Sequence, residues 1–96
     1  MGKLVLTRRA GESVKLTEPN GEVWVIRVEQ IASMLRQRIV GTLTTPSGFE
    51  RLYLDANQCR TFAGGNVELR PHKRPDQAIL AFDFHRDVTI VRTEIA

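Results

Sequence analysis

Two consecutive arginines, Arg8 and Arg9, follow a short apolar segment at residues 4–6 and are the side chains of this chain best suited to bind a charged ligand. Successive side chains of a strand point to opposite faces, so the two guanidinium groups would lie on both sides of one strand. A planar guanidinium donates paired hydrogen bonds to phosphates and base edges. The pattern predicts a strand at the edge of a sheet, where the core and a charged partner meet.

Arginine also supplies most of the positive charge. The chain has 14 Lys+Arg against 11 Asp+Glu, a net charge of +3, and its only lysines are Lys3, Lys15 and Lys73. This balance permits binding to a nucleic acid without requiring it. A genomic base composition that favours arginine codons would produce the same excess.

The residues that could support catalysis are not arranged in a known pattern. His72 and His85 match no nucleophile signature with Cys59, and Asp83 and Asp87 span a turn rather than a metal-binding loop. The chain has no Gly-rich phosphate loop. We therefore expect no enzyme activity, no cofactor, no metal and no small-molecule substrate.

Length and composition indicate one small folded domain over residues 1–96. A chain of this size buries about two thirds of its unfolded surface, and its hydrophobic fraction of 42% is ordinary for a globular protein. The single cysteine excludes an intrachain disulfide. No apolar run approaches the roughly 20 residues of a membrane span, so we expect a cytoplasmic protein.

The first third of the chain has the alternating pattern of strands. Residues 3–9, 13–18 and 22–31 each show the period of two that is typical of a strand with one buried face. Pro19-Asn20-Gly21 is a strong turn signal between the second and the third. In the third strand, Trp24 is expected in the core.

The middle of the chain predicts a hairpin and a helix. Residues 38–45 and 49–54 flank Pro46-Ser47-Gly48, which is the pattern of a hairpin. Asp55 is a possible N-cap for a short helix over residues 56–62 that ends at Gly64-Gly65.

The last third predicts three strands. A brief strand at residues 67–69 is followed by a basic loop at 70–75 and by strands at 77–84 and 88–95. Residues 37–45 and 77–84 both begin with glutamine and are rich in aliphatic residues. This similarity is too weak to establish an internal repeat.

The two ends of the chain together resemble the carbon storage regulator (CsrA/RsmA) family of small bacterial RNA-binding translational regulators. The opening Leu4-Val5-Leu6-Thr7-Arg8-Arg9-Ala10-Gly11-Glu12-Ser13 is similar to the family's Leu-Ile-Leu-Thr-Arg-Arg-x-Gly-Glu. The closing Asp87-Val88-Thr89-Ile90-Val91-Arg92-Thr93-Glu94-Ile95 is similar to the family's Glu-Val-Ser-Val-His-Arg-Glu-Glu-Ile. The two matches occur in the correct order at opposite ends of the chain.

The resemblance implies a mostly β, small antiparallel protein that forms an interlaced, strand-swapped homodimer. The first strand of one protomer would lie beside the last strand of the other, and the dimer would bind GGA-containing mRNA leaders or small RNAs to control translation. The RNA contacts transferred from the family are Leu6, Thr7, Arg8, Arg9, His85, Arg86, Val88, Ile90 and Arg92. Arg70, Lys73 and Arg74 in the basic loop are possible auxiliary contacts.

The chain departs from the family pattern at three places. Residues 32–75 form a central insertion with an inserted hairpin, and the family's C-terminal helix is absent, so the internal helix at 56–62 is expected to take its place. The family's Asn-Ala-Pro loop between the last two strands is here Asp83-Phe84-His85.

Two other interpretations stay open. Arg8 and Arg9 could be edge charges that discourage aggregation between sheets. Alternatively, the chain could be a protein-interaction or antagonist module that pairs with another protein, with Phe49 and Tyr53 of the inserted hairpin as the contact surface.

Overall fold

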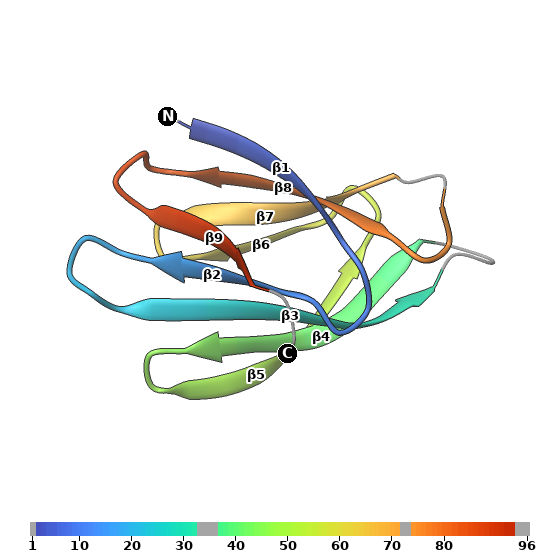
Figure 1. The fold of residues 1–96 in the computed structure, drawn as a ribbon, viewed down its shortest axis with the longest axis horizontal. Helices are drawn as coiled ribbons and strands as arrows, with labels where there is room; N and C mark the ends of the chain where they lie inside the picture. The colour runs from blue at the N-terminus through green and yellow to red at the C-terminus, as the bar shows by residue number, and fades with distance from the viewer. Residues whose placement is uncertain (1, 33–36, 72–73, 94–96) are drawn as a thin grey trace.

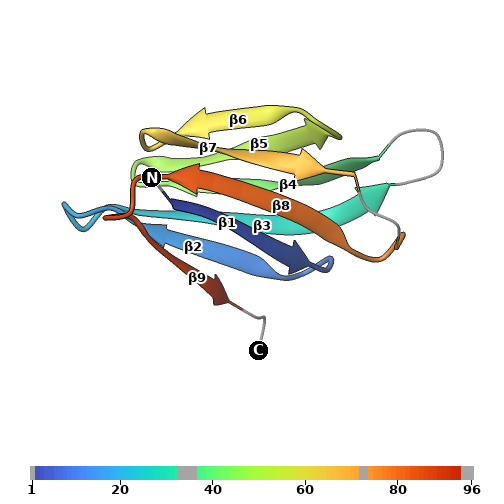
Figure 2. The same cartoon turned by 90° about the horizontal axis from the view of Figure 1, so that it is seen from above.

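The chain folds into two antiparallel sheets that lie face to face. The computed structural model describes residues 2–32, 37–71 and 74–93. These residues form the strands β1 (Gly2–Arg8), β2 (Ser13–Thr17), β3 (Val23–Ala32), β4 (Arg38–Thr45), β5 (Gly48–Asp55), β6 (Cys59–Phe62), β7 (Gly65–Arg70), β8 (Ala78–Phe84) and β9 (Thr89–Thr93). One sheet has the order β1-β8-β7-β6 and the other β5-β4-β3-β2-β9 (Figure 1, Figure 2). The predicted mostly β class is confirmed.

A single hydrophobic core fills the space between the sheets. Every second residue of the strands points into it, as in β8, where Leu80, Phe82 and Phe84 are buried. Full burial of one such side chain contributes about 1.5–3 kcal/mol, so the core is the main source of stability.

Aromatic side chains join the two layers. The ring centroid of Phe62 lies 5.3 Å from that of Trp24, which belongs to the five-stranded sheet, and 5.1 Å from that of Phe84. Such tilted pairs are favourable beyond the area that they bury. The Trp24 indole Nε1 donates a 2.9 Å hydrogen bond to Glu18 Oε2, which satisfies its polar end. Trp24 therefore packs against the core as predicted.

The predicted turns form as the residue types require. Gly21 has a φ of 90°, and its N–H donates to the carbonyl of Glu18, which closes the turn between β2 and β3. Pro46 and Ser47 connect β4 to β5, where Thr45 pairs with Gly48.

The prediction of a helix over residues 56–62 was wrong, because the described residues contain no helix. The Asp55 side chain binds Arg38 instead of capping a helix, and Asn57 has a φ of 70°, which a helix does not allow. Strand β6 follows. Ala63 and Gly64 both have positive φ and form a tight turn into β7, as in a type I′ hairpin.

The central segment, residues 32–75, forms part of both sheets. Strands β4 to β7 lie within residues 32–75 and supply two strands to each sheet. All strand pairings form within one chain, including β1 with β8 and β9 with β2. The structure thus gives no support to the predicted exchange of strands between two protomers.

Candidate nucleic-acid interface

The turn after β1 is built by the residues of the Arg-Arg-x-Gly-Glu segment. Glu12 Oε1 accepts a 2.7 Å hydrogen bond from the backbone N–H of Arg9 and lies 3.7 Å from Arg8 Nε. Gly11 has a φ of 93°, and its N–H donates to the carbonyl of Val28 in β3. A side chain at Gly11 would be strained in this conformation.

The two arginines have different environments. Arg8 is only 4% exposed, because it faces into the sandwich, and its Nε donates to the Thr7 carbonyl at 2.7 Å. Arg9 lies on the turn and is exposed. The expected contact between RNA and Arg8 is therefore replaced by a structural role, whereas Arg9 is available to a ligand.

Strands from opposite ends of the chain form neighbouring edges of the two sheets. β1 is an edge strand of the four-stranded sheet, and β9 is an edge strand of the five-stranded sheet. β9 starts after the turn at His85 and ends opposite Ser13, directly after the 9–12 turn. Because β1 also begins opposite Phe84 and ends at the 9–12 turn, the two edges run in the same direction.

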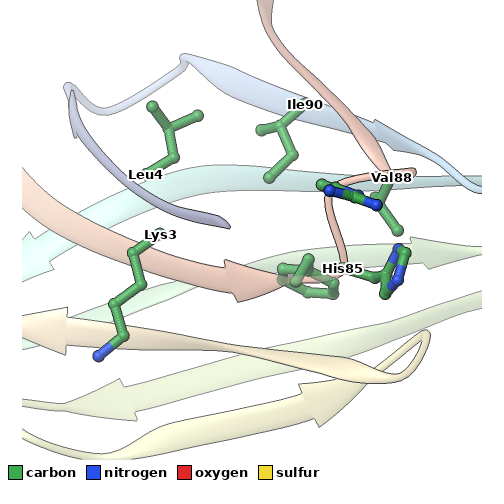
Figure 3. Close-up of a pocket in the computed structure, with 7 residues that line it drawn as sticks. Lys3, Leu4, His85, Val88 and Ile90 are labelled. Carbon is green, nitrogen blue, oxygen red and sulfur yellow. The ribbon is translucent and has the colours of Figure 1, made fainter. Parts of the chain in front are cut away.

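A cavity of about 220 Å³ opens between these edges at the end of β8. Leu4 from β1 and Ile90 from β9 lie on facing sides of it, close to His85 and Val88, while the Lys3 side chain extends away from them (Figure 3). The lining residues are Lys3, Leu4, Phe84, His85, Arg86, Val88 and Ile90. An apolar cleft with cations at its rim suits a flat ring that carries a charged backbone.

In the turn between β8 and β9, the His85 imidazole is hydrogen-bonded to the backbone of the same turn. His85 Nδ1 accepts a 3.1 Å hydrogen bond from the Asp87 N–H and lies 3.3 Å from Asp87 Oδ2. The Val88 N–H donates to the His85 carbonyl at 2.9 Å. Arg86, at the tip of this turn, is exposed.

Arg9, Arg86 and Arg92, which lie beside these edges, differ in their salt bridges from four arginines elsewhere in the fold. Within residues 2–32, 37–71 and 74–93, no carboxylate lies within salt-bridge distance of Arg9, Arg86 or Arg92. Four arginines elsewhere are compensated, in the pairs Arg38–Asp55, Arg51–Glu29, Arg60–Glu50 and Arg70–Glu68. Arg9, Arg86 and Arg92 are therefore cations beside the β1 and β9 edges that could meet an anion.

Hydrogen bonds strengthen two of these salt bridges, Arg51–Glu29 and Arg38–Asp55. A hydrogen bond from Thr42 lowers the pKa of Glu29, and Arg51 lowers it further. The hydrogen bond with Asp55 raises the pKa of Arg38. Both shifts favour the ionised forms of Glu29 and Arg38, which keeps their guanidinium–carboxylate pairs charged.

The predicted contact residues are brought together only in part. Leu6 and Thr7 are on β1, and Val88, Ile90 and Arg92 lie at or on β9, with Ile90 and Arg92 opposite the buried Leu16 and Val14 of β2. Thr7 and Arg92 are exposed, whereas Leu6, Val88 and Ile90 are half-buried.

Arg70, the first of the auxiliary basic residues, lies on the other side of β8 from β1. Thr7 and Arg70 both pair with Ile79, so Arg70 is two strands away from Thr7 on the same outer face. Its Nε is 2.9 Å from Glu68 Oε1, which reduces its free charge. Arg74 is exposed, and Lys73 lies outside the described residues.

Leu4, Lys3 and Phe84 line the cavity but were not predicted as site residues. The alternation of β1 places Leu4 on the same face as Leu6, and this signal could have identified it. Phe84 is only 2% exposed and also belongs to the hydrophobic core.

In the part of the chain that the structure describes, no group of three or more His, Cys, Asp or Glu side chains could hold a metal ion. No helix within that part is long and apolar enough to cross a membrane.

Comparisons of this chain with protein-family models, with curated proteins and with solved structures gave no match.

Proposed function

We propose that this chain is a post-transcriptional regulator that binds single-stranded RNA at the composite edge formed by β1 and β9. The observation that carries the proposal is the junction itself, because strands from the two ends of the chain that resemble the carbon storage regulator family meet around one cleft. Unpaired bases of RNA loops can enter such clefts, while arginines hold the phosphates.

The contacts divide by chemistry. Arg9, Arg86 and Arg92 are placed to meet phosphates or base edges, and Leu4 and Ile90 offer an apolar surface to a base. By analogy with the family, the preferred element is GGA in a hairpin loop or leader, and occupancy near a ribosome-binding site changes translation. The mechanism requires no catalysis.

A fluorescence anisotropy titration of a labelled GGA hairpin RNA tests the proposal. We expect the wild type to bind and Arg92→Ala to lose about 5- to 150-fold in affinity, which corresponds to the 1–3 kcal/mol of one specific arginine contact. Arg51→Ala is the matched control, because Arg51 is a strand arginine already paired with Glu29, and it should stay within about twofold of the wild type. No binding by the wild type at about 50 mM salt refutes RNA binding, since electrostatic contacts are strongest at low salt.

A second candidate is a protein-interaction or antagonist module. Phe49 and Tyr53 are 77% and 59% exposed on β5, an open edge of the five-stranded sheet, and aromatic residues are enriched at protein interfaces. Native mass spectrometry of this chain mixed with an ordinary family member tests this alternative. A mixed complex that is lost in Phe49→Ser/Tyr53→Ser supports it, and separate masses for the two proteins refute it.

A further inference from the structure

We infer that this chain is a self-contained, internally duplicated unit that works as a monomer with a single RNA site. The strands β2-β3-β4 and β6-β7-β8 are two three-stranded meanders, one in each sheet. The strand that precedes each meander pairs with the last strand of the other one, β1 with β8 and β5 with β4. The chain is therefore two copies of a four-strand unit whose first strands are exchanged.

The strand registers support the duplication. Residues on one face of β1 have counterparts 48 positions later in β5, in the pairs Leu4 and Leu52, and Leu6 and Leu54. Leu6 pairs with Leu80 of β8, and Leu54 pairs with Ile39 of β4, so both leucines hold the same place against the last strand of a meander.

The turn after the first strand is also repeated. The Gly11 N–H donates to the Val28 carbonyl, and the Val28 N–H donates to the Glu12 carbonyl. In the second copy, the Asn57 N–H donates to the carbonyl of Leu69, and the Leu69 N–H donates to the carbonyl of Gln58. In both copies, two consecutive turn residues thus hold one residue of the middle strand of a meander.

The duplication is incomplete at one edge. β9 covers the first strand of the first meander, β2, whereas β6 ends its sheet as an open edge (Figure 2). A strand equivalent to β9 would follow β4, but only Pro46 and Ser47 connect β4 to β5. Figure 1 shows β1 and β5 along opposite edges of the molecule. The β1 edge therefore has β9 beside it, around the cleft described above.

The two copies also differ in their charged residues. Ala56 stands where the first copy has Arg8, and Asn57 takes the place of Gly11 in the turn, so the second turn is shorter and has no counterpart of Arg9. Thr7 corresponds to Asp55, which is already bound to Arg38. The second copy thus preserves the packing and lacks the cations of the first.

This inference rests on the proposed function for its ligand and predicts one RNA element per chain. A protein with one site cannot bridge two elements of the same RNA, so it acts by occupancy of one element at a time. Two chains are needed to fill an RNA that carries two elements.

Sedimentation equilibrium without RNA, followed by native mass spectrometry with RNAs that carry one or two GGA hairpins, tests the inference. We expect the mass of one chain, 10.9 kDa, one chain on the single hairpin, and two chains on the double hairpin. Arg9→Ala should weaken RNA binding by about 5- to 150-fold, as for one arginine contact. The control variant in the second turn, Asn57→Gly, which keeps the positive φ of that turn, should leave RNA binding unchanged.

A dimer without RNA, or two RNA hairpins on one chain, overturns the inference. Loss of RNA binding in Asn57→Gly does so as well, because the second copy would then hold a site. A monomer that binds neither RNA supports the self-contained duplication and refutes the proposed function alone.

Discussion

Glu12→Ala should destabilise the fold, because Glu12 is the carboxylate beside a buried guanidinium. Arg8 is 4% exposed and its Nε lies 3.7 Å from Glu12 Oε1, while the same oxygen accepts the Arg9 N–H at 2.7 Å. Removal of one partner of a fully buried pair costs about 3–5 kcal/mol. The Glu12 side chain is 23% exposed, so water compensates part of this and we expect about 2–3 kcal/mol. For a domain of this size, that loss lowers Tm by roughly 10–20 °C.

Urea unfolding followed by tryptophan fluorescence measures this loss. Glu22→Ala is the control, since Glu22 is exposed and its side chain accepts a hydrogen bond from a turn residue, Asn20. This change should cost less than about 1 kcal/mol. The double variant Arg8→Met/Glu12→Gln should recover part of the loss, because an apolar side chain replaces the buried charge. If Glu12→Ala unfolds within about 0.5 kcal/mol of the wild type, the structural role assigned to the pair is wrong.

Three further changes test the packing and the electrostatics. Gly41→Ala should cost about 1–3 kcal/mol or prevent folding, because a Cβ at this position would lie 2.0 Å from the Arg27 carbonyl oxygen; circular dichroism melts measure it, and an unchanged Tm contradicts the register of β3 and β4. Phe62→Ala should cost about 3–5 kcal/mol in urea unfolding, because Phe62 joins the two sheets; a loss below about 1 kcal/mol contradicts that role. Thr42→Val should raise the pKa of Glu29 toward its ordinary value, because the hydrogen bond that lowers it is removed; NMR titration of the Glu29 carboxyl carbon checks this, and an unchanged pKa refutes the assignment.

The strands could be predicted from the sequence wherever alternation and turn residues agreed. The prediction of residues 38–45 matches β4, and Pro19-Asn20-Gly21 forms the predicted turn. Both signals are local, since the period of two and the backbone preferences of Pro, Asn and Gly act within a few residues.

The segment at 56–62 was mispredicted because distant residues determine its structure. Asp55 resembles a helix cap in sequence, but Arg38, 17 positions earlier, binds its carboxylate. Pairing of β6 with β7 then favours the extended conformation. Long-range pairing commonly overrides a short segment's own preference.

The candidate site could be predicted as a pair of strands but not as a set of exposed side chains. Arg8 and Arg9 are equivalent in sequence, and only the packing of β1 against the second sheet separates a buried side chain from an exposed one. The alternation of β1 and β9 is also the same whether their partners belong to one chain or to two. That choice depends on the central strands, whose pairing no local pattern specifies.

The placement of charge favours the proposed RNA site over a guard against aggregation. An edge guard needs charge of either sign on every exposed edge. The arginines of the β5 and β6 edges, Arg51 and Arg60, are each paired with a carboxylate, whereas no carboxylate of the described residues pairs with Arg9 or Arg92 beside β1 and β9. Uncompensated charge of one sign on two neighbouring edges favours attraction of a polyanion over a guard against aggregation.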